Sequence, residues 1–285
     1  MPLMQSRPYQ PVSLTVSIVL HRSSLDLLGR AMDSLAQAIE HAMARGQLSG
    51  ALIYLIDNAS GRAYCRQLEQ WLLHWPRPPQ VQVRWLPQGD NRGFGYGHNL
   101  VLEDLASDYH LVLNPDVEFA RDALDAGIAH LQGNPEVVLA SPGVAGSAGE
   151  QEFLCKAYPS VLVLLLRGFA PAFLRRLFQR RLDGYELRAQ CAGNEPVDVS
   201  IASGCCMLLR TDALRAVAGF DEAFFLYFED FDLSLRLQSQ GRLQFVPAMQ
   251  VVHHGGYAAS KGRDHIRWFV RSGVRFFRLH GWRWF

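Results

Sequence analysis

The sequence has no CxxC pair, no even set of cysteines and no long uncharged apolar run. Its 285 residues contain five scattered cysteines: Cys65, Cys155, Cys191, Cys205 and Cys206. An odd, scattered set does not form a disulfide framework, and two adjacent cysteines are poorly placed to bridge each other. We therefore expect reduced, mostly buried thiols.

Two further absences concern membranes and nucleic acids. No apolar run reaches the roughly 20 residues of a membrane-spanning helix, and the first residues lack the apolar segment of a signal peptide. These features predict a cytoplasmic protein. The formal net charge is only +1, which disfavours a nucleic-acid partner held by phosphate neutralisation.

A hydrophobic content of 49% allows a substantial core, in one large domain or two small ones. Short apolar runs rich in β-branched residues alternate with longer segments of helical pattern, which predicts an α/β fold with a mostly parallel sheet. We expect strands at 14–20, 51–56, 81–86, 109–113, 137–140, 197–201, 205–209, 243–246 and 249–252, and helices at 25–44, from 61 to about 75, from 99 to about 107, at 120–132 and at 263–280.

Three polar side chains follow predicted strands, at the sheet edge where α/β proteins bind ligands. Asp57 could cap the next helix or accept an N–H from a nucleotide base. Asp116 could end its strand or hold a divalent cation in front of a diphosphate. His253 or His254 could be a second metal ligand or a structural histidine.

The segment 89–99 is rich in glycine, yet it is not a GxGxxG fingerprint because its glycines are two residues apart and it follows the third strand. Its backbone N–H groups, with the side chains of Asn91 and Asn99, could bind an anion. The alternative is a plain flexible loop.

The stretch 219–237 places three carboxylates inside an aromatic run and at the start of a predicted helix. Glu229 and Asp232 share one side with Arg236, where an i,i+4 ion pair explains them without any function. Asp230 falls outside that pattern, beside aromatic residues whose poor solvation would raise its proton affinity and make it a usable base. An acidic helix start over a core is the structural alternative.

Taken in order, these motifs resemble family 2 glycosyltransferases, and more narrowly the bacterial rhamnosyltransferases of O-antigen and related surface polysaccharides. The resemblance covers nearly the whole chain except 142–190. It rests on VSIVL near the N-terminus, IDNAS at 56–60, NRGFGYGHN at 91–99, LNPDV at 113–117, SGCCMLLR at 203–210, GFDEAFFLYFEDFDLSLRL at 219–237 and VVHHGG at 251–256.

The resemblance implies a GT-A fold and inverting sugar transfer assisted by a divalent cation, Mg²⁺ or Mn²⁺. Asp230 matches the general base, with Glu229 and Asp232 as supports. Asp116 matches the last aspartate of the metal-binding DxD motif, and His253 matches the histidine that completes the metal site, with His254 as a possible substitute. The nucleotide site would comprise Asp57, Asn91, Gly93, Phe94, Asn99 and Asn114, the last of which replaces the first aspartate of DxD.

The same resemblance implies L-rhamnose transfer from dTDP-L-rhamnose to a lipid-linked saccharide. Another UDP- or dTDP-hexose is the nearest alternative donor, and a metal-dependent phosphohydrolase of nucleotide sugars is the rival of another class. We expect a catalytic domain over 1–258, with a nucleotide-binding half at 1–117, an insertion at 142–195 and a catalytic half at 197–258, followed by an amphipathic helix within 259–285.

Arginines gather beside large apolar residues in the segments 160–181 and 263–285. Such a composition is typical of interfacial attachment to an anionic membrane, and Gly168 and Pro171 bend the first segment too sharply for a spanning helix. We therefore expect a peripheral protein on the inner face of the cell membrane. The alternative is that both segments pack on the catalytic core with solvated arginines.

Overall fold

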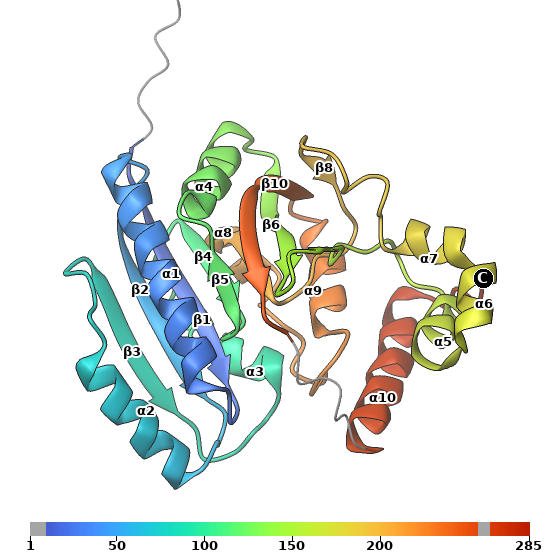
Figure 1. Cartoon of the computed structure of the whole chain (residues 1–285), viewed down its shortest axis with the longest axis horizontal. Helices are drawn as coiled ribbons and strands as arrows, with labels where there is room; N and C mark the ends of the chain where they lie inside the picture. The colour runs from blue at the N-terminus through green and yellow to red at the C-terminus, as the bar shows by residue number, and fades with distance from the viewer. Residues whose placement is uncertain (1–9, 256–262) are drawn as a thin grey trace, which may run out of the picture.

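A computed structural model describes residues 10–255 and 263–285. The described chain builds one ten-stranded sheet (Figure 1), in the order β3-β2-β1-β4-β9-β6-β10-β5, with β7 paired to β6 and β8 to β10. The strands are β1 (Val12–Leu20), β2 (Leu48–Asp57), β3 (Val81–Pro87), β4 (Tyr109–Leu113), β5 (Val117–Phe119), β6 (Val137–Gly146), β7 (Gln151–Glu152), β8 (Val197–Asp198), β9 (Cys206–Arg210) and β10 (Arg242–His253).

Most long strands are parallel, as predicted. Strands β1, β2, β3 and β4 pair in parallel, and so do β6 and β10. Strand β9 runs antiparallel between β4 and β6, and β5 runs antiparallel to β10. The carboxyl ends of the parallel strands and the first residue of β9 therefore meet at one edge of the sheet.

The helices are α1 (Leu25–Ala44), α2 (Arg62–His74), α3 (Phe94–Asn99), α4 (Ala123–Gly133), α5 (Val161–Phe169), α6 (Ala172–Leu177), α7 (Gln179–Tyr185), α8 (Thr211–Ala216), α9 (Glu229–Leu237) and α10 (Arg263–His280). Two core clusters fill the two faces of the sheet: one joins β1 and β2 to α1 and α4, and the other joins β9 and β10 to α8 and α9. Strands covered on both faces read as continuous apolar runs, which is why they were predictable.

Several predicted boundaries were wrong. The strand predicted at 137–140 continues as β6 to Gly146, and β5 was not predicted. The two strands predicted at 243–246 and 249–252 are one strand, β10, whose register shifts between Val246 and Gln250. Pro247 lies in that shift and has no N–H to donate to the ladder.

The helix predicted after Asn99 was misplaced. Helix α3 forms within the glycine-rich segment, and only a single 3₁₀ turn, Leu102–Asp104, follows it. A Cβ on Gly95 would lie 2.7 Å from Cβ of Phe220, and one on Gly97 would lie 2.8 Å from Val19. The glycines thus let a short helix press against β1 and the loop before α9.

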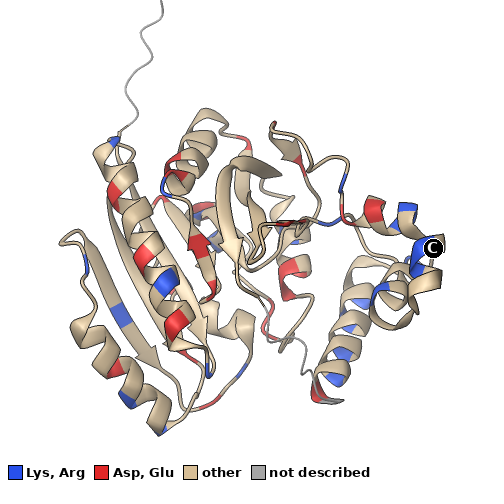
Figure 2. Cartoon of the chain, in the orientation of Figure 1, with Lys and Arg blue, Asp and Glu red and all other residues tan. Residues whose placement is uncertain are grey.

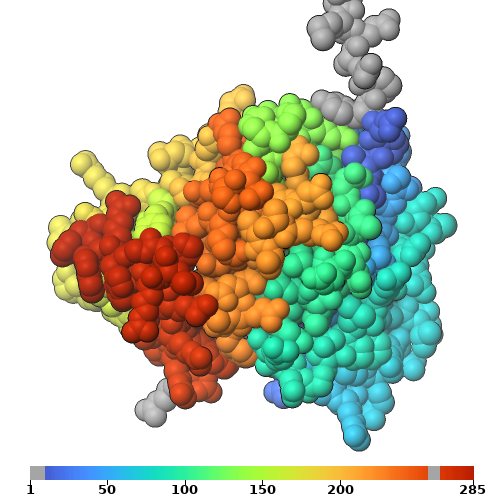
Figure 3. All heavy atoms as spheres, turned by 180° about the vertical axis from the view of Figure 1, so that it is seen from behind, coloured from blue at the N-terminus to red at the C-terminus, as the bar shows by residue number. Residues whose placement is uncertain are grey.

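The two arginine-rich segments lie side by side, and Figure 3 shows the C-terminal residues against the 160–181 segment. The backbone N–H of Val161 donates to Arg283 O at 2.8 Å, and that of Leu162 donates to Trp284 O at 3.2 Å. Phe276 and Phe277 of α10 form a buried cluster with Phe224 and Phe228, next to α9. Helix α10 is therefore an integral support of α9.

Candidate active site

The sheet edge gathers most of the predicted polar residues. Asp57 ends β2, Asn114–Asp116 follows β4, and His253 ends β10. The backbone N–H of Asn114 donates to Cys205 O at 2.8 Å, which joins the end of β4 to the start of β9. Burial, and to a smaller extent the charges of Asp116, Asp230 and Glu152, raise the pKa of the Cys205 thiol to about 12. Cys205 therefore lies between the segment that carries Asp116 and the neighbouring Gly204, whose N–H donates to Asp230.

Asp230 lies at the start of α9 with its carboxylate held by backbone donors. Gly204 N donates to Oδ2 and Phe231 N donates to Oδ1, each at 3.0 Å. Burial is the main cause that raises the pKa of Asp230 above its ordinary value. Asp230 also lines a cavity of about 450 Å³ between α5, α7, α9 and α10. An oriented carboxylate with raised proton affinity beside a cavity has the properties of a general base.

A strained turn places α9. Tyr227 and Phe228 have φ angles of +70° and +65°, in the left-handed region that bulky residues rarely adopt. Two such residues in succession cost on the order of 1–3 kcal/mol each. Phe228 is held there by the aromatic rings of Phe269 and Phe276 from α10. The C-terminal helix thereby stabilises the turn that presents Glu229 and Asp230.

The two neighbouring carboxylates differ from Asp230 and from each other. Glu229 is buried, and its Oε2 has no hydrogen-bond partner among the described residues. Burial, and then the charge of Asp230, raises its pKa well above the ordinary value. Asp232 forms the predicted i,i+4 pair with Arg236 at 2.8 Å, and its Oδ1 lies 2.7 Å from His280 Nε2. Asp232 therefore braces α9 against α10.

Asp116 and His253 face each other. His253 Nε2 lies 3.7 Å from Asp116 Oδ1, a buried atom without a hydrogen-bond partner in the described part of the chain. The distance is less than twice a metal–ligand bond of about 2.1 Å, so both atoms can bind one cation. His254 turns away, with its Nε2 2.8 Å from Glu118 Oε1. Of the two predicted histidines, the geometry favours His253.

The donor set at this position is small. No group of three or more His, Cys, Asp or Glu within residues 10–255 and 263–285 is arranged to hold a metal. Mg²⁺ commonly uses one or two protein ligands together with substrate phosphates and water. The residues Asp116 and His253 fit that pattern of binding, in which most of the ligands come from outside the protein.

The glycine-rich segment makes its hydrogen bonds inside the protein. Gly93 N donates to Asn91 Oδ1 at 3.0 Å, and Phe94 N donates to Phe225 O at 3.1 Å. Asn58 Nδ2 donates to Gly93 O at 2.8 Å. Gly93 has a φ of +105°, and a Cβ there would lie 2.3 Å from Phe225 O. Gly93 therefore allows close packing against Phe225, and the N–H groups of Gly93 and Phe94 are not available to an anion.

Two predicted nucleotide contacts also have internal partners. The amide of Asn99 bonds the Phe220 backbone in both directions, at 2.8 and 2.9 Å. Asp57 accepts from Ser60 N at 3.2 Å and from Cys65 Sγ at 3.3 Å. The geometry therefore favours a bracing role for Asn99. Asp57 does not cap α2, whose N-cap is Gly61 without a side-chain hydrogen bond, and it holds the turn before that helix instead. Gly93 and Phe94 lie against Phe225, just before the α9 turn.

Sequence reasoning missed a buried polar chain beneath α3. Ser17 Oγ lies 2.6 Å from His98 Nδ1 and 2.8 Å from His110 Nε2, and His110 Nδ1 lies 2.8 Å from Thr15 Oγ1. Burial lowers the pKa of His110 to about 3 and that of His98 well below its ordinary value. Both rings are therefore neutral near pH 7. The sequence feature that could have indicated this buried polar chain is the presence of Thr15 and Ser17 within an otherwise apolar strand.

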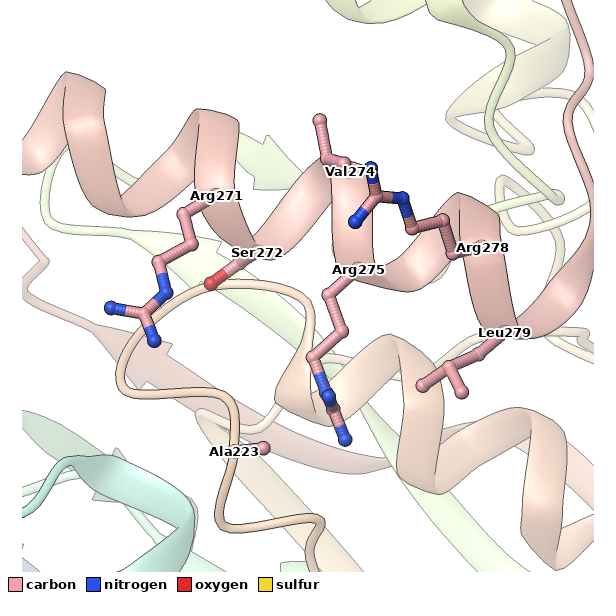
Figure 4. A pocket seen from close by; sticks show the side chains of 7 residues that line it. All are labelled: Ala223, Arg271, Ser272, Val274, Arg275, Arg278 and Leu279. Atoms are coloured by element: carbon pink, nitrogen blue, oxygen red, sulfur yellow. The ribbon is translucent and has the colours of Figure 1, made fainter.

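A second cavity lies apart from these residues. It measures about 430 Å³ and opens between α10 and Ala223, where Arg271, Arg275 and Arg278 surround it (Figure 4). Arg275 is engaged there, because its guanidinium pairs with Asp221 at 2.6 Å. None of the predicted catalytic or metal-binding residues lines this cavity, so it is not part of the candidate active site.

A family model described as "Glycosyl transferase family 2" matches residues 16–217. The chain belongs to glycosyl transferase family 2. The matched span contains Asp57, Gly93 and Asp116 and ends before α9, so Asp230 and His253 lie outside it. The expectation of a glycosyltransferase is thus confirmed at the level of the family.

Curated relatives of this family 2 chain are glycosyltransferases. It is 31% identical over 194 residues, 64% of its length, to "N-acetylglucosaminyl-diphospho-decaprenol L-rhamnosyltransferase" of Mycobacterium tuberculosis. It is 26% identical over 197 residues, 65% of its length, to "Rhamnosyltransferase WbbL" of Escherichia coli. The similarity covers 61% of the mycobacterial proteins and 69% of WbbL.

Solved structures confirm the predicted GT-A-type fold of this family 2 chain. GalNAc-T7, crystallised with UDP, GalNAc and Mn²⁺, superimposes with a TM-score of 0.64 at 15% identity, over 94% of this chain and 48% of that one. The mannosyltransferase PcManGT from Pyrobaculum calidifontis, with GDP-Man and Mn²⁺, gives 0.59 at 15% identity, over 88% and 59%. At such identities the likeness concerns the fold.

Proposed function

We propose that this chain is an inverting glycosyltransferase that moves L-rhamnose from dTDP-L-rhamnose to a lipid-linked saccharide. The observation that carries the proposal is the placement of Asp230, a backbone-oriented carboxylate with raised proton affinity that lines a cavity. It is linked to the segment of Asp116 through Gly204, which donates to Asp230, and Cys205, which accepts from Asn114 N. The names of the rhamnosyltransferase relatives support the choice of sugar.

The chemistry of the step follows from these positions. Asp230 accepts the proton of an acceptor hydroxyl, whose oxygen attacks C1 of the donor sugar while the bond from C1 to the phosphate oxygen breaks. Attack and departure on opposite faces invert the configuration at C1. Gly204 N and Phe231 N keep the carboxylate of Asp230 aimed at the cavity, so little reorientation is needed before proton transfer.

We place the metal at Asp116 Oδ1 and His253 Nε2. A divalent cation bound there would offset the negative charge that gathers on the leaving diphosphate. The Glu152 carboxylate lies 3.2 Å from His253 Nδ1 and can only accept, so a neutral His253 carries its proton on Nδ1 and presents a lone pair at Nε2 toward Asp116.

We also propose attachment to an anionic membrane. In the described residues, ten of the eleven exposed large hydrophobic side chains lie in the arginine-rich segments. They are Leu165, Phe169, Phe173, Leu177, Ile266, Val270, Leu279, Trp282, Trp284 and Phe285. Figure 2 shows that basic residues recur along α10 and around α6. No described helix is both long and apolar enough to cross a bilayer.

A donor screen tests the proposal. Nucleotide sugars are added to the protein with and without Mn²⁺ or Mg²⁺, and the melting temperature is measured, since a ligand that binds the folded state stabilises it. We expect the largest shift with dTDP-L-rhamnose and a cation. A larger shift with a UDP- or dTDP-hexose would change the donor assignment.

Product analysis then separates transfer from hydrolysis. With donor and a lipid-linked saccharide, a transferase yields an extended saccharide, whereas a phosphohydrolase of nucleotide sugars yields cleaved donor without an added acceptor. Donor cleavage that is independent of the acceptor would overturn the proposal.

A further inference from the structure

The cavity beside Asp230 is lined in part by elements that have no role in the proposed binding of the donor and the metal. Its lining comes from α5, α7, the turn before α9, α9 itself and α10. The first two lie in the 160–185 region, which sequence reasoning left without a catalytic role. A volume of about 450 Å³ is within the range of small-molecule sites.

The polar groups of this cavity call for a hydroxylated ligand. Glu229 Oε2 is buried without a partner in the described chain, and Glu229 lines the cavity. The buried Tyr185 hydroxyl has no hydrogen-bond partner among the described residues, and the Arg167 guanidinium lies over the Tyr185 ring, 5.5 Å from its centroid. Buried polar atoms without partners are costly, and a ligand that supplies hydroxyl groups removes that cost. Phe231 and Phe269 add apolar walls.

One end of the cavity is cationic. Arg167, with 44% of its side chain exposed, lies 3.4 Å from Glu186, and that same carboxylate also neighbours Lys156 at 3.8 Å and Arg188 at 2.7 Å. Three cations thus share Glu186, and Arg188 also pairs with Asp183 at 3.2 Å, which leaves three positive charges against two negative ones. Burial, and then the charge of Arg167, lowers the pKa of Lys156 to about 8. An anion at Arg167 would relieve this excess of positive charge.

The cationic end borders the exposed apolar surface. Helix α5 carries Arg167 and Gly168 on the cavity, and Leu165 and Phe169 are exposed on the same helix. A ligand that extends from Asp230 past Arg167 therefore reaches the surface for which we propose membrane contact. A saccharide joined to a lipid through phosphate has this order of groups: hydroxyls, then negative charge, then hydrocarbon.

We propose that this cavity is the acceptor site, in which the sugar lies against Asp230 and Glu229 and Arg167 binds the phosphate that joins it to its lipid. The inference rests on the proposed glycosyltransferase function. It assigns acceptor recognition to α5, α7 and α10, outside the strands that form the metal and nucleotide edge.

Gly168 offers a test that spares the fold. It lies on α5 and lines the cavity, and a Cβ there meets no atom within 4 Å. Gly168→Leu fills the cavity while replacing a poor helix former. Gly184→Leu on α7 is the matched control, because Gly184 also has free space for a Cβ and does not line the cavity. Arg167→Gln removes the cation, and Arg175→Gln on α6 is its control.

Binding is measured by titration calorimetry with two soluble probes in the presence of dTDP and Mn²⁺: a saccharide diphosphate with a short alkyl chain, and the same saccharide as an alkyl glycoside. We expect Gly168→Leu to weaken both probes at least 10-fold, and Arg167→Gln to weaken only the diphosphate probe by about 10-fold or more, the size of one charged hydrogen bond. The controls should match the parent, and all variants should bind dTDP equally.

Three results would overturn the proposal: no binding of the diphosphate probe by the parent, equal loss in Gly168→Leu and Gly184→Leu, or equal loss of both probes in Arg167→Gln. Because binding is read without turnover, a parent that binds the probes but transfers no sugar would contradict the proposed reaction and leave the acceptor site supported. Melting temperatures identify any variant that fails to fold. If Arg167→Gln fails to fold, Arg167→Lys replaces it. Because lysine keeps the charge, we then expect only a partial loss of affinity for the diphosphate probe.

Discussion

The imidazole Nδ1 of His253 lies 3.2 Å from Oε2 of Glu152, on the side of the ring opposite Asp116. Glu152 belongs to β7, a two-residue strand that pairs with β6. A carboxylate behind a metal-binding histidine fixes the ring and its tautomer. This contact gives a short edge strand a defined part in the proposed metal site.

The first prediction therefore concerns metal affinity. Asp116→Ala should abolish Mn²⁺-dependent dTDP binding, His253→Ala should weaken it strongly, and Glu152→Gln should lower Mn²⁺ affinity by about 10- to 100-fold. Free Mn²⁺ is counted by electron paramagnetic resonance as dTDP is added. His254→Ala is the matched control, because His254 faces Glu118. Equal behaviour of the two histidine variants would remove His253 from the site.

The second prediction separates two neighbouring carboxylates. Asp230→Asn should lower kcat by about 10²- to 10⁴-fold while the protein stays folded and binds donor. Asp232→Asn should instead cost about 1–3 kcal/mol of stability, because it breaks the contacts with Arg236 and His280. Turnover per folded molecule measures the effect of Asp230→Asn, and urea unfolding measures the effect of Asp232→Asn. Near-normal turnover by Asp230→Asn would disprove its role as base.

The third prediction is a pH dependence of stability. The folded state raises the pKa of Glu229 through burial and then through Asp230, so it favours the protonated form. This contribution is complete below the ordinary pKa of 4.5 and is lost as pH rises toward the folded-state value. Glu229→Gln should therefore gain stability over the parent between pH 4.5 and 7.5, by up to about 1.4 kcal/mol per pH unit.

Urea unfolding of parent and variant at four pH values across that range measures this difference. Because both proteins share every other titrating group, subtraction isolates Glu229 together with its electrostatic coupling to Asp230. A constant difference would mean that Glu229 titrates normally, in conflict with its burial.

The fourth prediction concerns Gly93. Gly93→Ala combines a positive φ with a Cβ only 2.3 Å from Phe225 O, so it should destabilise the protein by more than about 2 kcal/mol and displace the α9 turn. Gly46→Ala has a φ of +73° and no atom within 4 Å of the added Cβ, so it should cost about 1 kcal/mol. Thermal melts compare the pair, and equal losses would show that packing at Phe225 is unimportant.

The fifth prediction concerns the membrane. Arg267, Arg271 and Arg278 are exposed on α10, whereas Arg275 pairs with Asp221. Changing the three exposed arginines to Glu should abolish co-sedimentation with anionic liposomes, since each basic residue contributes about 1 kcal/mol. The matched control changes Arg62, Arg66 and Arg77 to Glu, on and just after α2 at the far end of the molecule (Figure 1).

For the parent, we expect binding to anionic but not neutral vesicles, weakened by salt. Absence from both pellets at low salt would refute the membrane proposal. Equal losses in the two triple variants would mean that net charge, and not α10, controls binding.

The sequence alone determined the framework of this protein. Apolar runs such as 14–20 and 51–56 predicted buried parallel strands, because a strand covered on both faces must be apolar throughout. The free cysteines were predicted too, and all but Cys65 are buried. The spacing of Asp232 and Arg236 predicted their ion pair, because helix geometry alone brings i and i+4 together. The ordered motifs also indicated the family.

Only the tertiary structure decided which polar groups are free. Asn99, Gly93 and Asp57 were predicted as nucleotide contacts, and only the structure shows that they also form hydrogen bonds with Phe220, Asn91 and Ser60. The choice of His253 over His254 depended on Asp116, more than 130 residues earlier. Such pairings arise when strands far apart in the chain meet at one sheet edge, and local sequence patterns carry no record of them.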